Sequence, residues 1–322
     1  MEVLSWSGDW NLPSIDISCL EVLAYAKFAG CPLRVNQCNN PRKSPIGEFP
    51  VLQSGEDVLT TSSKIMDYLR EKNFNADYQL TAKQGADTLA FVSLVHSKLY
   101  PAISFTFWMD DKNYTKFTRP WYAHRLPFPL NYFVPGRISR QTRYQISEGM
   151  YSEETDDVLE NKLFKDALEC LKLLSTMLDG KEFFFGDSPT TLDAVVFAHL
   201  AVIWKAPLPN NKLFNYLQGY DNLCMFCGRI LQRYFPQAQQ EEQQQPSQSS
   251  SAQDDTVDST EKRNKWLALG FAGLAMTLYA LFSGLVQVEI TRVGDDDLNE
   301  STPDMSAFTF RGQEKDGENT TE

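Results

Sequence analysis

Residues 14–30 read SIDISCLEVLAYAKFAG, an apolar run that decides how the fold begins. Ser14 stands where a helix N-cap is expected, and Gly30 directly follows the apolar residues, where a helix ends. Short segments rich in β-forming residues flank the run, at 2–6 (EVLSW) and 33–37 (LRVNQ). This order predicts a β-α-β unit.

A second unit follows along the chain. Residues 49–53 (FPVLQ) and 58–60 (VLT) are predicted to be strands around a tight turn, and residues 62–72 (SSKIMDYLREK) place their apolar side chains on one helical face. This order predicts a β-β-α unit. The stretch between the two units is too broken for a good helix, because it contains Pro41, Pro45 and Gly47.

From about residue 80 the strand signals give way to helical periodicity. The clearest segment, residues 156–179, carries an apolar stripe and has Gly180 as its expected stop. Residues 125–137 (RLPFPLNYFVPGR) contain three prolines, so we expect an ordered loop or a short kinked connection there rather than a helix. The second half of the head, which we define as residues 1–236, is predicted to be all-α.

Residues 266–288 (WLALGFAGLAMTLYALFSGLVQV) contain no charged side chain. At about 1.5 Å per residue they form a helix of roughly 35 Å, which crosses a hydrocarbon core about 30 Å thick. A buried core helix is the alternative, but no polar stripe at helical spacing supports it. The sequence therefore predicts a C-terminal transmembrane helix in contact with membrane lipid.

The two flanks of this segment differ in charge. Three basic residues precede it, Trp266 stands at its edge as an interfacial aromatic residue, and acidic residues follow it. By the positive-inside rule the head faces the cytosol. The residues of the membrane flank are Lys262, Arg263, Lys265 and Trp266.

The net charge limits the classes of partner. The chain has 322 residues and a formal charge of −12, whereas nucleic-acid binding requires a concentrated basic surface. We therefore expect no nucleic-acid partner. The six cysteines should be reduced thiols, because the head is predicted to face the cytosol.

Few side chains offer catalytic or metal chemistry. Cys224 and Cys227 form a C-x-x-C pair, but the pair lies in a helical run with no second pair for zinc, so we expect two buried packing groups. His96, His124 and His199 belong to no metalloprotease or nucleophile-elbow motif, and His199 is expected in the core or an interface. The sequence therefore predicts no metal site and no catalytic residue.

Two motifs resemble the glutathione transferases. Residues 48–52 (EFPVL) look like the strand of that fold with a cis-proline, here Pro50, while a trans proline at an edge strand is the alternative. Residues 186–193 (GDSPTTLD) look like the structural box at the start of a helix, with Thr190 as N-cap and Asp193 at the third helical position. The resemblance implies an α/β thioredoxin-like N-terminal half and an all-α C-terminal half.

The glutathione site of that fold looks degraded in this sequence. After the first strand the transferases have a Tyr, Ser or Cys that activates the glutathione thiol, whereas this chain offers only Ser14, which the helix needs as its cap. In place of the acid-Ser pair of the transferases it has Thr61 and Ser62. We expect no cofactor, with a membrane-tethered glutathione-dependent transferase as the alternative function.

Longer blocks resemble the metaxin family, and they lie at residues 6–30, 74–114, 118–137, 183–194 and 222–235. The resemblance implies a mitochondrial outer-membrane protein facing the cytosol, and a non-enzymatic subunit of the sorting and assembly machinery that supports protein import and β-barrel insertion. It implies a metaxin-2-like subunit and the β-barrel core of that machinery as partners. The acidic residues after the span are a departure, since mitochondrial tail anchors commonly have basic residues there.

The expected organisation has five parts. They are a thioredoxin-like domain at 1–78, a helical domain like the C-terminal domain of the transferases at 79–236, a disordered linker at 237–265, a transmembrane helix at 266–288 and a disordered acidic tail at 289–322. The aromatic stretch PFPLNYFVP, residues 127–135, is our hypothesis for a docking element. Packing of the same rings against the helices of the head is the alternative.

Overall fold

The structure is a computed structural model that describes residues 1–148, 156–236, 273 and 276. Internal contacts divide the chain into two units, Met1–Ser247 and Gln248–Glu322, and the first contains all described residues except Gly273 and Met276. Apart from those two positions, the predicted span at 266–288 and its basic flank lie outside the described residues. None of the described helices combines the length and the apolar character that a membrane crossing requires.

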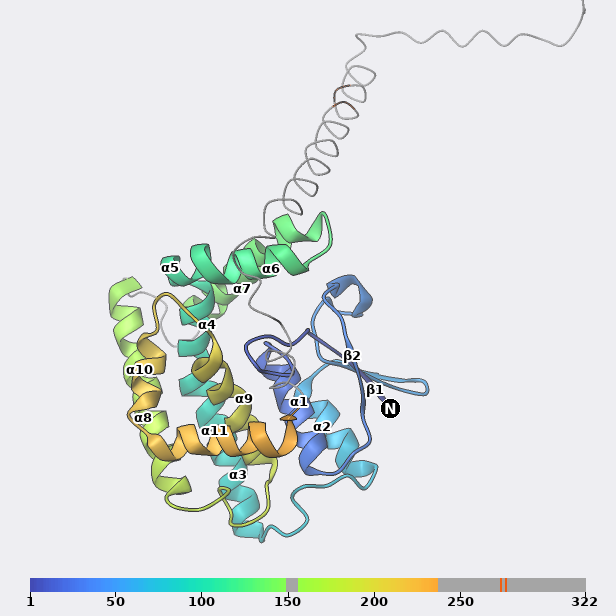
Figure 1. The fold of residues 1–322 in the computed structure, drawn as a ribbon, viewed down its shortest axis with the longest axis vertical. Coiled ribbons are helices and arrows are strands. Elements are labelled where there is room, and N and C mark those ends of the chain that lie inside the picture. Colours follow the sequence, from blue (N-terminus) through green and yellow to red (C-terminus); the bar gives the residue numbers. More distant parts are fainter. Residues whose placement is uncertain (149–155, 237–272, 274–275, 277–322) are drawn as a thin grey trace, which may run out of the picture. The chain divides into compact units, whose positions relative to one another are not determined.

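The N-terminal half contains a four-stranded sheet with the strand order β2-β1-β3-β4 (Figure 1). β1 (Glu2–Ser5) pairs in parallel with β2 (Arg34–Gln37) and antiparallel with β3 (Val51–Ser54), which pairs antiparallel with β4 (Asp57–Leu59). A parallel pair needs a crossover connection, and α1 (Ile17–Phe28) supplies it. The predicted β-α-β unit is confirmed.

The predicted β-β-α unit is confirmed as well. α2 (Ser62–Glu71) follows β4 and buries Ile65, Met66 and Leu69, the apolar face expected from the sequence. Between the two units the chain forms η1 (Pro41–Lys43), a single 3₁₀ turn, as the prolines there indicate.

α1 begins later than expected. The predicted N-cap at Ser14 is wrong, because Asp16 is the N-cap and its carboxylate accepts a hydrogen bond from the Cys19 amide at 2.9 Å. Ser14 Oγ instead accepts from the Asp16 amide. Serine and aspartate cap helices about equally well, so the sequence alone does not choose between them. Gly30, with φ of +65°, lies just past the helix as predicted.

The second half is all helical, as predicted. Its helices are α3 (Ala82–Leu94), α4 (Tyr100–Trp108), α5 (Asp111–Asn113), α6 (Arg119–Arg125), α7 (Leu130–Glu148), α8 (Asp156–Leu178), α9 (Thr191–Lys205), α10 (Lys212–Gln218) and α11 (Asp221–Tyr234). Two π-helical turns, η2 (Val95–Leu99) and η3 (Tyr114–Thr118), connect α3 to α4 and α5 to α6. α8 confirms the helix predicted at 156–179, but Asp179, with φ of +49°, ends it instead of Gly180.

The prediction of a loop or kinked connection at 125–137 is wrong from residue 130 onward. α7 begins at Leu130 and continues through Pro135. The other two prolines precede the helix, so only Pro135 removes a helical hydrogen bond. Val134 packs with Trp121 of α6 in a buried cluster, and Ser139 donates to the Trp108 carbonyl of α4 at 2.9 Å. These tertiary contacts offset the lost bond.

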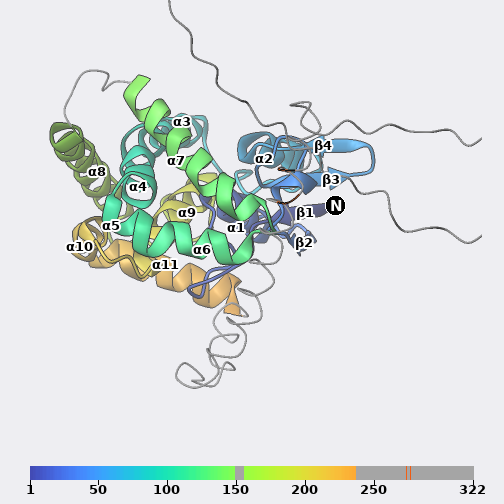
Figure 2. The same ribbon diagram turned by 90° about the horizontal axis from the view of Figure 1, so that it is seen from above.

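α1 and α9 form the centre of the head. All residues from Cys19 to Ala26 in α1 and from Thr191 to Ile203 in α9 are buried, and the two helices pack against each other. Figure 2 shows the sheet on one side of α1 and the helical half on the other. One core cluster therefore contains residues of both halves, and polar groups on these two helices require partners inside the protein.

Candidate functional site

A cavity of about 90 Å³ lies where the two halves meet. Asp16 lines it from the start of α1, Tyr100 and Ser104 from α4, and Trp121 and Tyr122 from α6. Cavities that bind small organic molecules usually measure roughly 300–1,000 Å³. This one has both aromatic and polar side chains in its walls and has room for only a few water molecules.

The titratable groups of this cavity are poorly suited to activating a thiol. Burial raises the pKa of the Asp16 carboxyl to about 6, and it raises the pKa of the Tyr100 and Tyr122 hydroxyls. Both tyrosines therefore stay protonated at neutral pH. Close to Asp16, burial raises the pKa of the Cys19 thiol far above its ordinary value, so it is not a thiolate either.

A larger hollow of about 600 Å³ lies between the chain after α1 and the end of α11. Cys31 and Leu33 line one side of it, and Tyr234 and Phe235 line the other. Burial raises the pKa of the Cys31 thiol, so that this cysteine is also protonated. The hollow offers surface for packing rather than an acid–base pair.

The positions expected for a glutathione site offer no replacement for the missing groups. Ser14 is buried, and its Oγ is held by the Asp16 amide at 3.3 Å. Thr61 is the N-cap of α2 but makes no side-chain capping hydrogen bond, and Ser62 is the first residue of that helix.

The three structural residues predicted from the sequence lie within the head. The Phe49–Pro50 peptide bond is cis, at the start of β3. Thr190 precedes α9 as its N-cap residue. The Thr190 amide and the Thr190 hydroxyl donate hydrogen bonds to the Asp193 carboxylate, at 2.8 Å and 2.7 Å. Asp193 also accepts from the Phe184 amide at 3.0 Å, which ties the preceding loop to the helix.

The C-x-x-C pair lies on α11. Cys227 is buried and Cys224 is partly buried, and burial raises the pKa of both thiols. Their position inside a helix and their protonated state agree with two packing groups, as the sequence indicated.

The histidines show an arrangement that the sequence did not predict. His96 Nε2 lies 3.3 Å from Glu21 Oε1, and His199 Nδ1 lies 3.8 Å from the same oxygen. These three are the one group of possible metal ligands among the described residues. Burial lowers the pKa of His199. The available signal was Glu21 itself, since a carboxylate inside an apolar helix needs a buried partner.

Two protein-family profiles match the chain. Residues 19–139 match Tom37, described as an outer mitochondrial membrane transport complex protein, and residues 167–230 match the C-terminal domain of glutathione S-transferase. Among solved structures, the apo form of glutathione S-transferase III has a TM-score of 0.47 at 14% identity, covering 74% of this chain and 95% of that one.

Among known proteins, metaxin-1 of Mus musculus is 46% identical over 295 residues, covering 90% of this chain and 92% of the relative. The chain belongs to the metaxin family. Metaxin-3 of Danio rerio is 45% identical, and the match covers 74% of this chain and 77% of that relative. The metaxin-1 homolog of Caenorhabditis briggsae is 36% identical, and the match covers 74% of this chain and 75% of that relative. The metaxin resemblance and the transferase-like fold inferred from the sequence are thereby confirmed.

In this metaxin the aromatic stretch at 127–135 is only partly covered by the head. Phe128 is 52% exposed, Tyr132 57% and Phe133 69%. Leu126, just before the stretch, and Val134, near its end, are buried. The rings in the middle therefore face solvent, and we call Phe128, Tyr132 and Phe133 the aromatic patch.

Proposed function

We propose that this chain is a non-enzymatic subunit of the sorting and assembly machinery of the mitochondrial outer membrane, where it supports protein import and β-barrel insertion. The match of residues 19–139 to an outer mitochondrial membrane transport complex family carries this proposal. The similarity to metaxin-1 over nine tenths of the chain supports it.

The proposed organisation keeps the five parts expected from the sequence. A thioredoxin-like domain at 1–78 and a helical domain at 79–236 form the head, which faces the cytosol. A linker at 237–265 connects the head to a single membrane span at 266–288, and an acidic tail follows at 289–322. The charge-free composition of 266–288 and the basic residues before it support this topology.

The non-enzymatic role rests on the chemistry of the cavity between the halves. Its tyrosines and the neighbouring thiol of Cys19 are protonated at neutral pH, and its volume of about 90 Å³ leaves little room for a tripeptide such as glutathione. Titration of the purified full-length chain with glutathione in a calorimeter should give no binding heat. Saturable binding would favour the alternative, a membrane-tethered transferase.

We assign the aromatic patch to contact with a metaxin-2-like subunit, while the β-barrel core of the machinery is the second proposed partner. Aromatic side chains supply much of the binding free energy in protein interfaces, because each buries a large rigid surface. Three such rings are exposed within residues 128–133, on a folded helix and its leading turn, and they form a contact surface for a partner protein.

The test is native gel electrophoresis of mitochondria that express the chain in place of the endogenous protein. Wild type should comigrate with a β-barrel assembly complex, and a Phe128→Asp, Phe133→Asp variant should lose the metaxin-2-like subunit. Tyr78→Asp is the matched control, because Tyr78 is 72% exposed but lies outside the patch. A folded double variant that keeps its partner would refute the docking assignment, and migration of wild type as a free monomer would refute the subunit role.

A further inference from the structure

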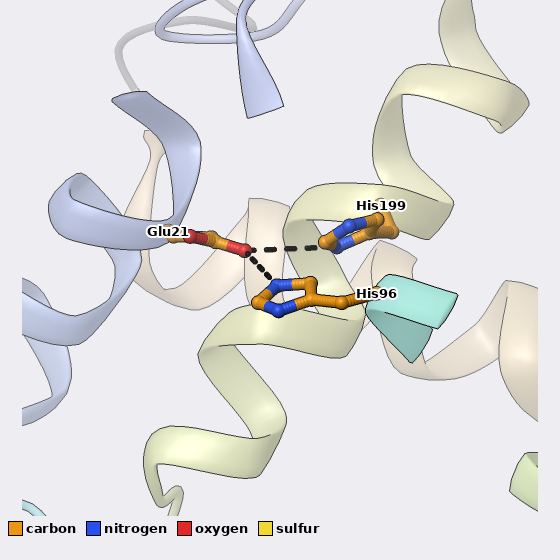
Figure 3. A group of neighbouring side chains, drawn as sticks. All are labelled: Glu21, His96 and His199. Carbon is orange, nitrogen blue, oxygen red and sulfur yellow. Dashed lines mark hydrogen bonds and ion pairs between the residues drawn. The ribbon is translucent and has the colours of Figure 1, made fainter. Parts of the chain in front are cut away.

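Glu21, His96 and His199 come from three different elements and meet at one point, as Figure 3 shows. Glu21 belongs to α1, His96 to the π-helical turn η2 and His199 to α9. Each residue offers one ligand atom, and these atoms all lie within 4.8 Å of one another. Isolated π-helical turns are frequent at functional sites, because they redirect single side chains.

His96 and Glu21 are already at the separation of two metal ligands. The distance from His96 Nε2 to Glu21 Oε1 is 3.3 Å. Two ligands that each bind a tetrahedral zinc ion at about 2.0 Å lie about 3.3 Å apart. The Glu21 side chain is only 4% exposed, so its carboxylate needs a positive partner inside the protein.

One ring nitrogen of His199 forms a hydrogen bond within the protein, and the other forms none among the described residues. Its Nδ1 lies 2.8 Å from the Val195 carbonyl and donates to it, which leaves the lone pair on Nε2. This Nε2 is buried and has no hydrogen-bond partner among the described residues. Metal-binding histidines commonly show this arrangement, in which the second nitrogen donates to a backbone carbonyl and orients the ring.

We propose that Glu21, His96 and His199 bind one divalent transition-metal ion, for which zinc is the best match. Two imidazoles and one carboxylate are ligands that zinc accepts, and a water molecule completes four-coordinate geometry. The His96 side chain is 49% exposed, so an ion can enter from solvent at this side. Because Nδ1 is the His199 nitrogen that lies 3.8 Å from Glu21 Oε1, the ring turns to present Nε2 to the bound ion.

The expected role of this ion is to hold the two halves of the head together. Glu21 lies in the N-terminal half, whereas η2 and α9 belong to the helical half. An ion that binds only the folded protein shifts the unfolding equilibrium toward it. At a free zinc concentration about 100 times the Kd, the Tm should rise by about 5–10 °C.

The test uses the full-length chain purified in detergent, depleted of metal and titrated with Zn²⁺ against a chromophoric competitor. Wild type should bind one equivalent, and His96→Ala should lower the affinity at least about 10-fold. His124→Ala is the matched control, because His124 is an exposed histidine on α6 outside the cluster. A Cys224→Ser, Cys227→Ser variant controls for binding by thiols, and both controls should match wild type.

Two further readouts keep the proposal falsifiable if a variant folds poorly. Co²⁺ bound to wild type should show d–d absorption without thiolate charge-transfer bands, and Zn²⁺ should raise the Tm of wild type but not of His96→Ala. Equal affinity of wild type and His96→Ala, or binding that disappears in the double cysteine variant, would overturn the site. So would a wild-type Tm that Zn²⁺ leaves unchanged, which would show that the cluster is an ion pair only.

Discussion

At the scale of single residues, Asp16 combines two tasks. It caps α1 through the Cys19 amide, and its carboxylate lines the cavity between the halves. Burial raises its pKa from an ordinary value of 3.8 to about 6. Below about pH 3 the carboxyl is protonated in both the folded and the unfolded chain, so its ionisation affects stability only above that pH.

Asp16→Asn should therefore change how stability depends on pH. The unfolded chain releases this proton near pH 4 and the folded chain near pH 6, so the wild type loses stability as the pH rises between these values. We expect the variant to be more stable than wild type by about 2 kcal/mol at pH 7. This is less than the whole shift of the Asp16 pKa implies, because Asp16 is partly exposed and solvent screens its charge. Asparagine keeps the helix cap.

Urea unfolding of both proteins between pH 4 and pH 7 measures this difference. Other groups titrate in the same range, but they are common to the two proteins and cancel in the comparison. The difference should shrink steadily as the pH falls from 7 to 4, because fewer of the unfolded chains then carry an ionised Asp16. Parallel pH profiles would show that Asp16 does not carry the raised pKa.

Two histidines illustrate what sequence reading misses at this scale. His96 and His199 lie in different helical segments, and nothing in their spacing indicates that both approach Glu21. Only the packing of α9 against α1 and η2 brings the three side chains together. The sequence did indicate correctly that His199 is a core residue.

At the scale of elements, α9 depends on its first turn. The Asp193 carboxylate accepts from the Thr190 amide and hydroxyl and from the Phe184 amide, all in buried surroundings. Thr190→Ala removes one of these hydrogen bonds and should lower the free energy of unfolding by about 1 kcal/mol. Asp193→Ala leaves two buried amides unpaired and should cost about 3 kcal/mol.

Thermal and urea unfolding test whether Asp193→Ala destabilises the protein more than Thr190→Ala does. Thr190→Ala should cost less in the Asp193→Ala background than in wild type, because the two side chains share one network. Thr176→Ala, on the exposed side of α8, is the control and should change stability by less than about 0.5 kcal/mol. A Thr190→Ala protein with an unchanged Tm would show that the box is not structural.

α7 shows where local rules fail at this scale. Three prolines within residues 125–137 favour a loop, yet two of them precede the helix and the third is tolerated inside it. Burial of Val134 with Trp121 and the bond from Ser139 to α4 decide the outcome. The partners in these contacts, Trp121 and the Trp108 carbonyl, lie outside α7, so a local reading cannot include them.

At the scale of the whole molecule, Asp77 joins the two halves of the head. Its carboxylate accepts hydrogen bonds from the Thr191 amide at 2.8 Å and from the Thr191 hydroxyl, at the first residue of α9. Arg70 of α2 lies 3.2 Å from the same carboxylate. Together with the packing of α1 on α9, this contact makes the head one unit with a shared core.

Attachment to the membrane is also a property of the whole chain, and we assign it to residues 266–288. Substitution of Leu274 and Leu281 by Arg should release the protein from membranes, because each arginine near the centre of a span costs about 2.5–3.5 kcal/mol on insertion. Carbonate extraction measures the membrane-bound fraction. Leu298→Arg in the acidic tail is the control and should stay in the pellet. A double variant that also stays there would mean that the head holds the chain on the membrane through a partner.

The sequence by itself determined the order of strands and helices in the N-terminal half, the helical second half and the family. These features follow from local periodicity, from turn residues and from motifs that are contiguous in the chain. Tertiary structure alone decided that α7 runs through Pro135 and that Glu21 meets His96 and His199. The physical reason is that these outcomes depend on contacts between segments distant in sequence, whose free energies outweigh local preferences of about 1–3 kcal/mol.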